Sequence, residues 1–176
     1  VYDEGYGLSA DRSVTHQRTA ILLKRGVKSL GPCLIVVDRL SPADDKPHRY
    51  QWLWHLNTET AEIDGLTVRS NDGGRPNLAI VPAARAGLHV SVVCGQETPE
   101  FQGWKAIKNH QQGEYMPTPT AVYELEASGP VRMVTVLYPT RAHESNPIAA
   151  VEAGAGAEDH DIHVTMTDGR VVEVNV

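Results

Sequence analysis

Cysteine is scarce in this chain of 176 residues. Cys33 and Cys94 are its only two, and they stand far apart, so no Cys-x-x-Cys pair exists and a thiolate zinc site is excluded. Both lie in strongly apolar stretches, which predicts buried free thiols. A disulfide is the alternative if their strands face each other, and the sequence leaves the redox state open.

The chain also lacks an excess of positive charge. Its 16 Lys and Arg residues are outnumbered by 22 Asp and Glu residues, giving a formal net charge of −6. Because phosphate binding needs a basic face, this balance argues against nucleic acid as a partner.

Long hydrophobic runs are absent as well. No stretch approaches the length needed to span a bilayer, so no membrane partner is expected, and no signal peptide is visible. The chain begins at Val1 rather than at a methionine, and we expect it to be a piece of a longer protein.

Strand-like patterns dominate what is present. The stretches 14–24, 33–40 and 48–57 are rich in β-branched, aliphatic and aromatic residues and are separated by turn residues, which predicts an antiparallel meander. Further strands are expected at 66–70, 77–82, 88–94, 120–127, 131–138, 148–152, 161–167 and 170–176. Asn71-Asp72-Gly73-Gly74 and Asp168-Gly169 are typical of hairpin turns.

These strands predict one all-β domain over residues 1–176. A composition of 41% hydrophobic and 22% charged residues is that of a globular protein. Ten to twelve short antiparallel strands, with turn signals about every ten residues, indicate a β-sandwich of two layers.

Two groups of aromatic residues are candidates for sugar binding. Trp52 and Trp54 share one face of the third strand and form either a wall of the core or an open platform for sugar rings. The long polar loop 95–119 is expected to be ordered for a purpose or to cover the core as a lid, and Trp104 and Tyr115 lie in it.

The charged residues and histidines of this chain give little support for a catalytic or metal site. Asp38 lies on an apolar face and needs a partner, for which Arg18, Arg39 or a turn amide are candidates. His16, Asp38 and His55 lie on strands that are neighbours in the predicted meander, but no spacing typical of metal ligands is present, so no metal or other cofactor is expected here. No nucleophile elbow or phosphate loop is found either, so no catalytic residue is assigned.

Several short motifs follow one another in a defined order between residues 14 and 139. They are VTHQRTAILLK (Val14–Lys24), VVDRL (Val36–Leu40), HRYQWLWHL (His48–Leu56), Gly103-Trp104, MPTP (Met116–Pro119), VYE (Val122–Glu124) and VTVLYP (Val134–Pro139). Together they resemble the distal, C-terminal part of the β-sandwich in the heparinase II/III-like polysaccharide lyases.

This resemblance implies a function for a larger parent protein. In that family an α/α toroid precedes the sandwich, and polysaccharide is cleaved by β-elimination next to a uronic acid. A tyrosine and a histidine transfer the protons, and a His-x-His-x-Asp segment holds a metal in several members. None of those motifs occurs here, so the resemblance assigns them, with any divalent metal, to an upstream part of the parent.

The resulting expectation is a bacterial, secreted or periplasmic lyase whose C-terminal sandwich supports the active cleft and is inactive alone. Its partners would be the upstream toroid and a polysaccharide that contains uronic acid, either glycosaminoglycan-like or alginate-like. The alternatives are a stand-alone carbohydrate-binding module, which uses Trp52, Trp54, Trp104 or Tyr115, and a sandwich that only mediates domain packing.

Overall fold

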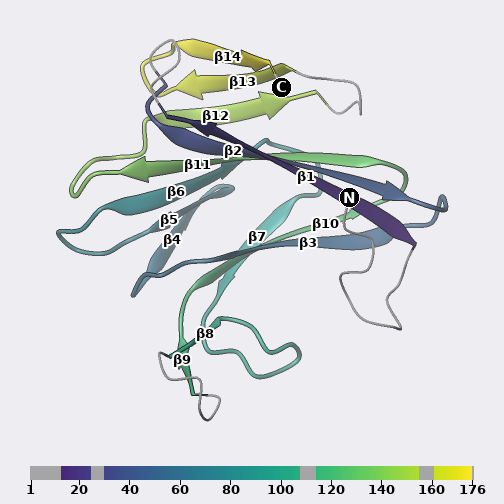
Figure 1. The fold of residues 1–176 in the computed structure, drawn as a ribbon, viewed down its shortest axis with the longest axis horizontal. Coiled ribbons are helices and arrows are strands. Elements are labelled where there is room, and N and C mark those ends of the chain that lie inside the picture. Colours follow the sequence, from purple (N-terminus) through teal and green to yellow (C-terminus); the bar gives the residue numbers. More distant parts are fainter. Residues whose placement is uncertain (1–12, 25–29, 108–113, 155–160, 176) are drawn as a thin grey trace.

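The chain folds into β-strands, as the sequence predicts (Figure 1). A computed structural model describes residues 13–24, 30–107, 114–154 and 161–175, and these ranges contain fourteen strands and no helix. The described residues accordingly include no helix that is long and apolar enough to cross a membrane. The all-β antiparallel class is confirmed.

A six-stranded sheet forms the middle of the molecule. Its strand order is β1-β2-β11-β6-β5-β4, and every neighbouring pair is antiparallel. Its strands are β1 (Val14–Leu23), β2 (Cys33–Pro42), β4 (Ala61–Asp64), β5 (Thr67–Ser70), β6 (Asn77–Pro82) and β11 (Val131–Thr140).

Two three-stranded sheets and a small hairpin complete the described structure. One sheet has the order β3-β10-β7, from β3 (His48–His55), β7 (His89–Val93) and β10 (Thr120–Ala127). The other has the order β12-β13-β14, from β12 (Ile148–Ala153), β13 (Asp161–Met166) and β14 (Val171–Asn175). The hairpin pairs β8 (Trp104–Ala106) with β9 (Tyr115–Pro117) and projects from the β3-β10-β7 side (Figure 1).

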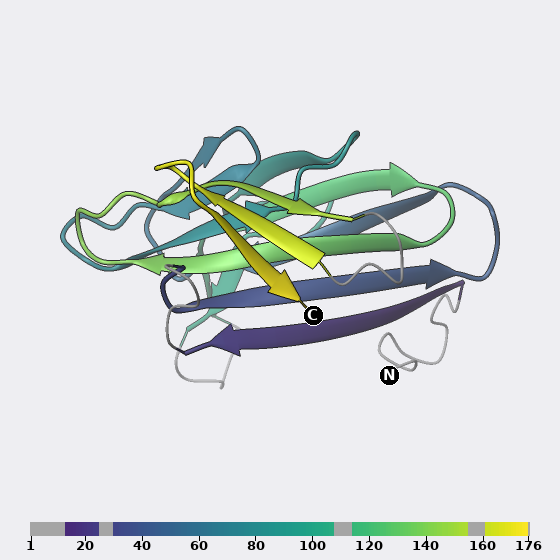
Figure 2. The same cartoon turned by 90° about the horizontal axis from the view of Figure 1, so that it is seen from above.

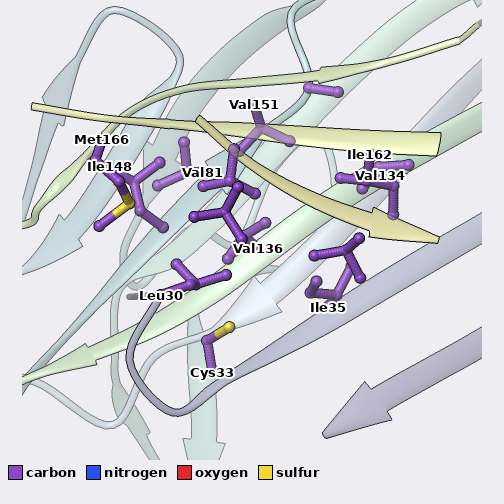
Figure 3. Packing of buried hydrophobic residues seen from close by; sticks show 14 of the residues in the cluster. Leu30, Cys33, Ile35, Val81, Val134, Val136, Ile148, Val151, Ile162 and Met166 are labelled. Atoms are coloured by element: carbon purple, nitrogen blue, oxygen red, sulfur yellow. The ribbon is translucent and has the colours of Figure 1, made fainter. Parts of the chain in front are cut away.

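The six-stranded sheet is covered on both faces, so the molecule has three layers rather than the two expected. The C-terminal sheet lies over one face of the six-stranded sheet (Figure 2). Alternate residues of β2, such as Ile35 and Val37, belong to one core with Ile162 and Val164 of that sheet. Figure 3 shows Ile35 and Ile162 within this core. The opposite face contributes to a second core: Leu40, Ile80 and Met133 pack with Tyr50, Trp52, Tyr123 and Leu125 of the β3-β10-β7 sheet.

Covering both faces explains why the central strands lack alternation. In β2, β6 and β11 nearly every residue is buried or half-buried, and their sequences are rich in aliphatic residues without a strict alternation with polar ones. Strands buried on both faces are expected to read this way.

The predicted meander is correct only for its first two strands. β1 pairs with β2 along their whole length, but β3 crosses to another layer and pairs with β10, where Trp52 lies opposite Tyr123. The hairpins β5–β6 and β13–β14 form around the predicted turns. The short strands β4, β8 and β9 were not predicted.

The two cysteines differ in exposure, and both are free. Cys33 is buried, as expected, and burial raises the pKa of its thiol to about 11. Cys94 is exposed, against expectation, because it follows the last residue of β7 and lies outside the sheet.

We therefore predict that only one thiol reacts in the folded chain. The thiolate is the nucleophile, and at about pH 8 the buried Cys33 is both shielded and protonated. Counting thiols with a chromogenic disulfide reagent should give one per native chain and two in denaturant. Cys94→Ser should leave none reactive before unfolding, and a native Cys94→Ser chain that still reacts would contradict the burial of Cys33.

Candidate functional site

The β8–β9 hairpin and the loop that leads into it carry three aromatic rings that the fold brings together. The Phe101 and Trp104 rings stack with their centroids 5.4 Å apart and an interplanar angle of 4°. The Phe101 and Tyr115 rings meet edge to face, with their centroids 5.7 Å apart. Phe101 is 59% exposed and Tyr115 52%, while Trp104 is half-buried. We call Phe101, Trp104 and Tyr115 the hairpin cluster.

Gly103 fixes the position of this cluster. It adopts a φ of +77°, and a Cβ atom on it would lie 2.8 Å from both Cys94 Cα and the Val93 carbonyl oxygen. Only glycine fits where the loop crosses the end of β7. The Gly103 carbonyl accepts hydrogen bonds from the backbone N–H groups of Gly95 and Thr118, which ties both sides of the loop together.

Polar contacts hold the hairpin cluster in place. The Trp104 indole Nε1–H donates to the Gln96 carbonyl at 2.9 Å, and the Lys105 ammonium donates to Asn57 Oδ1 at 2.5 Å. An exposed group of rings on a braced loop is unusual for a surface that contacts only water. Such rings can stack on the apolar face of a sugar.

Trp104 and Tyr115 are therefore together, as their common loop suggested, and Phe101 joins them. Sequence reasoning assigned no role to Phe101, although it is the only phenylalanine of the chain and stands three residues before Trp104. The three-residue spacing of Phe101 and Trp104 was the one signal in the sequence that their rings could meet. The approach of Tyr115 could not be predicted in this way, because it depends on the pairing of β8 with β9.

Trp52 and Trp54 lie elsewhere, between the sheets. Trp52 is 3% exposed and belongs to the core, so its ring offers no face to a sugar. Trp54 is half-buried, and the guanidinium carbon of Arg18 lies 5.4 Å from its ring centroid. Trp52 therefore forms part of the core wall, and Trp54 packs partly against the same core.

Asp38 is the centre of a polar cluster on the same side of the six-stranded sheet. Its side chain is 1% exposed, and Arg18 donates to both of its oxygens, from Nε at 2.7 Å and from Nη2 at 3.0 Å. His16 Nε2 lies 2.6 Å from Oδ1. Arg18 is thus the partner that the sequence required, and the register places it directly opposite Asp38 on the neighbouring strand.

The third residue considered for a metal site is remote from this cluster. His55 Nδ1 lies 3.0 Å from the Thr120 hydroxyl oxygen on the outer face of the β3-β10-β7 sheet. Within the described ranges, no three His, Cys, Asp or Glu side chains are grouped so that they could hold a metal ion.

Comparison by sequence finds nothing: no family model matches the chain and no curated protein is detectably similar to it. Comparison of folds does find similar structures. The heparinase III that is the BT4657 gene product superposes with a TM-score of 0.66 at 11% identity, over 96% of this chain and 25% of that one. The chain has the fold of the C-terminal portion of heparinase III.

Two further structures agree. Heparan sulfate lyase HepC from Pedobacter heparinus gives a TM-score of 0.60 at 13% identity, over 81% of this chain and 22% of that one. Another heparinase III structure superposes with a TM-score of 0.61 at 15% identity, over 81% of this chain and 21% of that one. The chain thus spans about a quarter, or less, of the length of each protein it resembles, and the likeness is one of fold.

The Asp38 cluster generates a stability prediction. Arg18→Met removes the main partner of a buried carboxylate, and losses of this kind cost about 3–5 kcal/mol in the free energy of unfolding. Because Arg18 is itself half-exposed, we expect a loss of about 3 kcal/mol in urea denaturation.

The matched control removes both charges. Arg18→Met combined with Asp38→Leu should recover most of the loss, since apolar side chains can replace a buried ion pair at little cost. A double variant no more stable than Arg18→Met alone would show that the carboxylate is not what the arginine stabilises.

Proposed function

We propose that this chain is the C-terminal β-sandwich of a heparinase-like polysaccharide lyase. The parent would cleave a polysaccharide that contains uronic acid by β-elimination, and this piece would support the active cleft without supplying the catalytic residues. The observation that carries the proposal is the match to heparinase III, which takes in 96% of this chain but only 25% of the enzyme. A lyase for such polymers works outside the cytoplasm, so we extend the proposal to a secreted or periplasmic parent.

The chemistry of three described tyrosines is unfavourable for catalysis. β-Elimination needs a base beside C5 of the sugar and a group that neutralises the uronate, held together in a cleft. Burial raises the pKa of Tyr50, Tyr123 and Tyr138, which is opposite to what a tyrosine base requires. The Tyr123 hydroxyl is in addition occupied, since it donates to the carbonyls of Leu66 and Ile80.

Two described histidines contact carboxylates: His16 Nε2 lies 2.6 Å from Asp38 Oδ1, and His48 Nε2 lies 2.8 Å from Asp44 Oδ1. In this proposal the toroid and the metal site, if the parent has one, belong to upstream sequence.

A carbohydrate-binding module is the second candidate, and the hairpin cluster favours it. Three braced rings, two of them more than half exposed, form a surface that could hold a sugar chain without cleaving it. The two functions are compatible, because a supporting sandwich can also grip the substrate of its parent.

We predict no cleavage by this chain alone. Incubated with heparan sulfate, with chondroitin sulfate or with alginate, it should produce no rise in the ultraviolet absorbance of a new C4–C5 double bond. The parent protein should produce that rise on at least one of them. Product formed by the 176-residue chain would overturn the supporting role.

The hairpin cluster should determine any retention on polysaccharide. Affinity electrophoresis in gels that contain the polymer cleaved by the parent should show retardation of the chain. Phe101→Ala or Tyr115→Ala should weaken it about 2- to 10-fold, the effect of losing one aromatic contact.

Ile63→Ala is the matched control, because Ile63 is a large exposed hydrophobic residue on β4, in the six-stranded sheet and outside the hairpin cluster. It should migrate like the unchanged chain. If the unchanged chain is not retarded by any polymer, the binding-module candidate fails.

A further inference from the structure

The β8–β9 hairpin has two faces, and the hairpin cluster occupies only one of them. Tyr115 lies on the cluster face, whereas Lys105 and Met116, which pair with each other across the ladder, lie on the opposite face. The Ile107 N–H donates to the Glu114 carbonyl at 3.0 Å, which continues the ladder by one more pair. Because side chains alternate along a strand, Ile107 shares the face of Lys105 and Met116. We call Ile107 and Met116 the second face.

The second face carries two exposed apolar side chains. Ile107 is 39% exposed and Met116 is 41% exposed. Eight large hydrophobic residues are exposed in the described part of the chain, and half of them gather in this hairpin and its loop: Phe101, Ile107, Tyr115 and Met116. Apolar residues that are exposed together, rather than scattered singly, mark an interaction surface.

A hairpin of this size gains little stability from its own pairing. β8 and β9 have three residues each, and a two-stranded hairpin in water is marginal unless a further layer packs on it. Phe101 supplies such packing on the cluster face, where it stacks on Trp104. Ile107 and Met116 belong to neither of the two cores found among the described residues. The second face is therefore the side on which a further layer can pack.

The stem of the hairpin is fixed to the sandwich. The Thr118 N–H donates to the Gly103 carbonyl at 2.8 Å, and the Thr118 hydroxyl donates to the Leu56 carbonyl. The Leu56 N–H donates to the Pro119 carbonyl at 2.9 Å, and the Lys105 ammonium reaches Asn57. The hairpin thus projects as a braced arm (Figure 1). A surface held in this way loses little conformational freedom when a partner packs on it.

The composition of the second face indicates a protein partner. Neither Ile107 nor Met116 offers a ring on which a sugar could stack, and methionine is enriched at protein interfaces. Glu114, which lies opposite Ile107, adds an exposed carboxylate to the border of the face. An apolar surface bordered by a basic side chain is complementary to this arrangement.

The size of the second face favours a partner within the same protein. Two side chains, each about two-fifths exposed, offer far less area than the roughly 800 Å² per partner that a stable complex of separate proteins buries. Surfaces joined in one chain need less, because the linkage holds them at a high effective concentration. This chain matches only 21–25% of the heparinase III structures, so a parent of that kind would contain a large upstream part.

We propose that Ile107 and Met116 form a docking surface through which this sandwich packs against the upstream part of its parent. Both side chains enter an apolar surface of that part, and Glu114 faces a basic residue at its border. The hairpin cluster, on the opposite face, is left open. This docking surface rests on the proposed function only in that the parent must extend well beyond this chain.

Amide hydrogen exchange compares the hairpin in the parent and in the 176-residue chain. Residues 104–107 and 114–117 should exchange about tenfold more slowly in the parent, because docking covers the second face there. Equal exchange of these residues in the two proteins would overturn the docking surface.

A double variant of the parent, Ile107→Ser with Met116→Ser, tests the two side chains themselves. A segment of the upstream part should exchange about tenfold faster than in the unchanged parent, since the loss of buried apolar area weakens docking. This readout lies outside the hairpin, so a merely local effect on β8 and β9 would not move it.

Ile63→Ser is the matched control, because it makes the same change at an exposed isoleucine of β4. It should leave the exchange of the upstream part unchanged. If the double variant also leaves it unchanged, the docking surface is refuted. If that variant instead loses retention on polysaccharide, the second face belongs to the polysaccharide and not to a protein contact.

The docking surface and the lyase proposal fail separately. Protection of the hairpin in a parent that cleaves no polysaccharide would remove only the lyase proposal. Cleavage by a parent whose hairpin exchanges as fast as in the 176-residue chain would remove only the docking surface.

Discussion

Burial of both faces of one antiparallel sheet is the constraint on which the rest of this structure depends. The strands β2, β6 and β11 present aliphatic side chains on both faces, and each face must be removed from water. The β3-β10-β7 sheet covers one face and the C-terminal sheet covers the other. Neither outer sheet would have a core of its own without the central one.

The same arrangement explains where polar groups gather. Next to the outer strand β1, β2 carries a buried carboxylate in place of an aliphatic side chain. Asp38 is tolerated in that position because Arg18 and His16 reach it from β1. The Asp38 charge, which would be costly in the middle of the sheet, thus lies next to the edge strand and holds two basic side chains in place.

Much of the fold could be predicted from local pattern. Alternation, β-branched runs and turn residues placed most of the strands and both hairpin turns, and the apolar face around Asp38 required a partner that proved to be Arg18. The candidate site was predicted in part. Trp104 and Tyr115 were candidates because they share one long loop, whereas the approach of Tyr115 to Phe101 and Trp104 depended on the pairing of β8 with β9.

By itself, the amino-acid order determined that this chain forms antiparallel strands and where most of them lie, because side-chain alternation and turn chemistry act over a few residues. Only the tertiary structure decided that β3 leaves β2 for β10, that a third layer exists, and that Trp52 is buried. The reason is physical: strand pairing and layer stacking are selected by contacts between residues far apart in sequence, and local pattern carries no record of which distant strand offers the best fit.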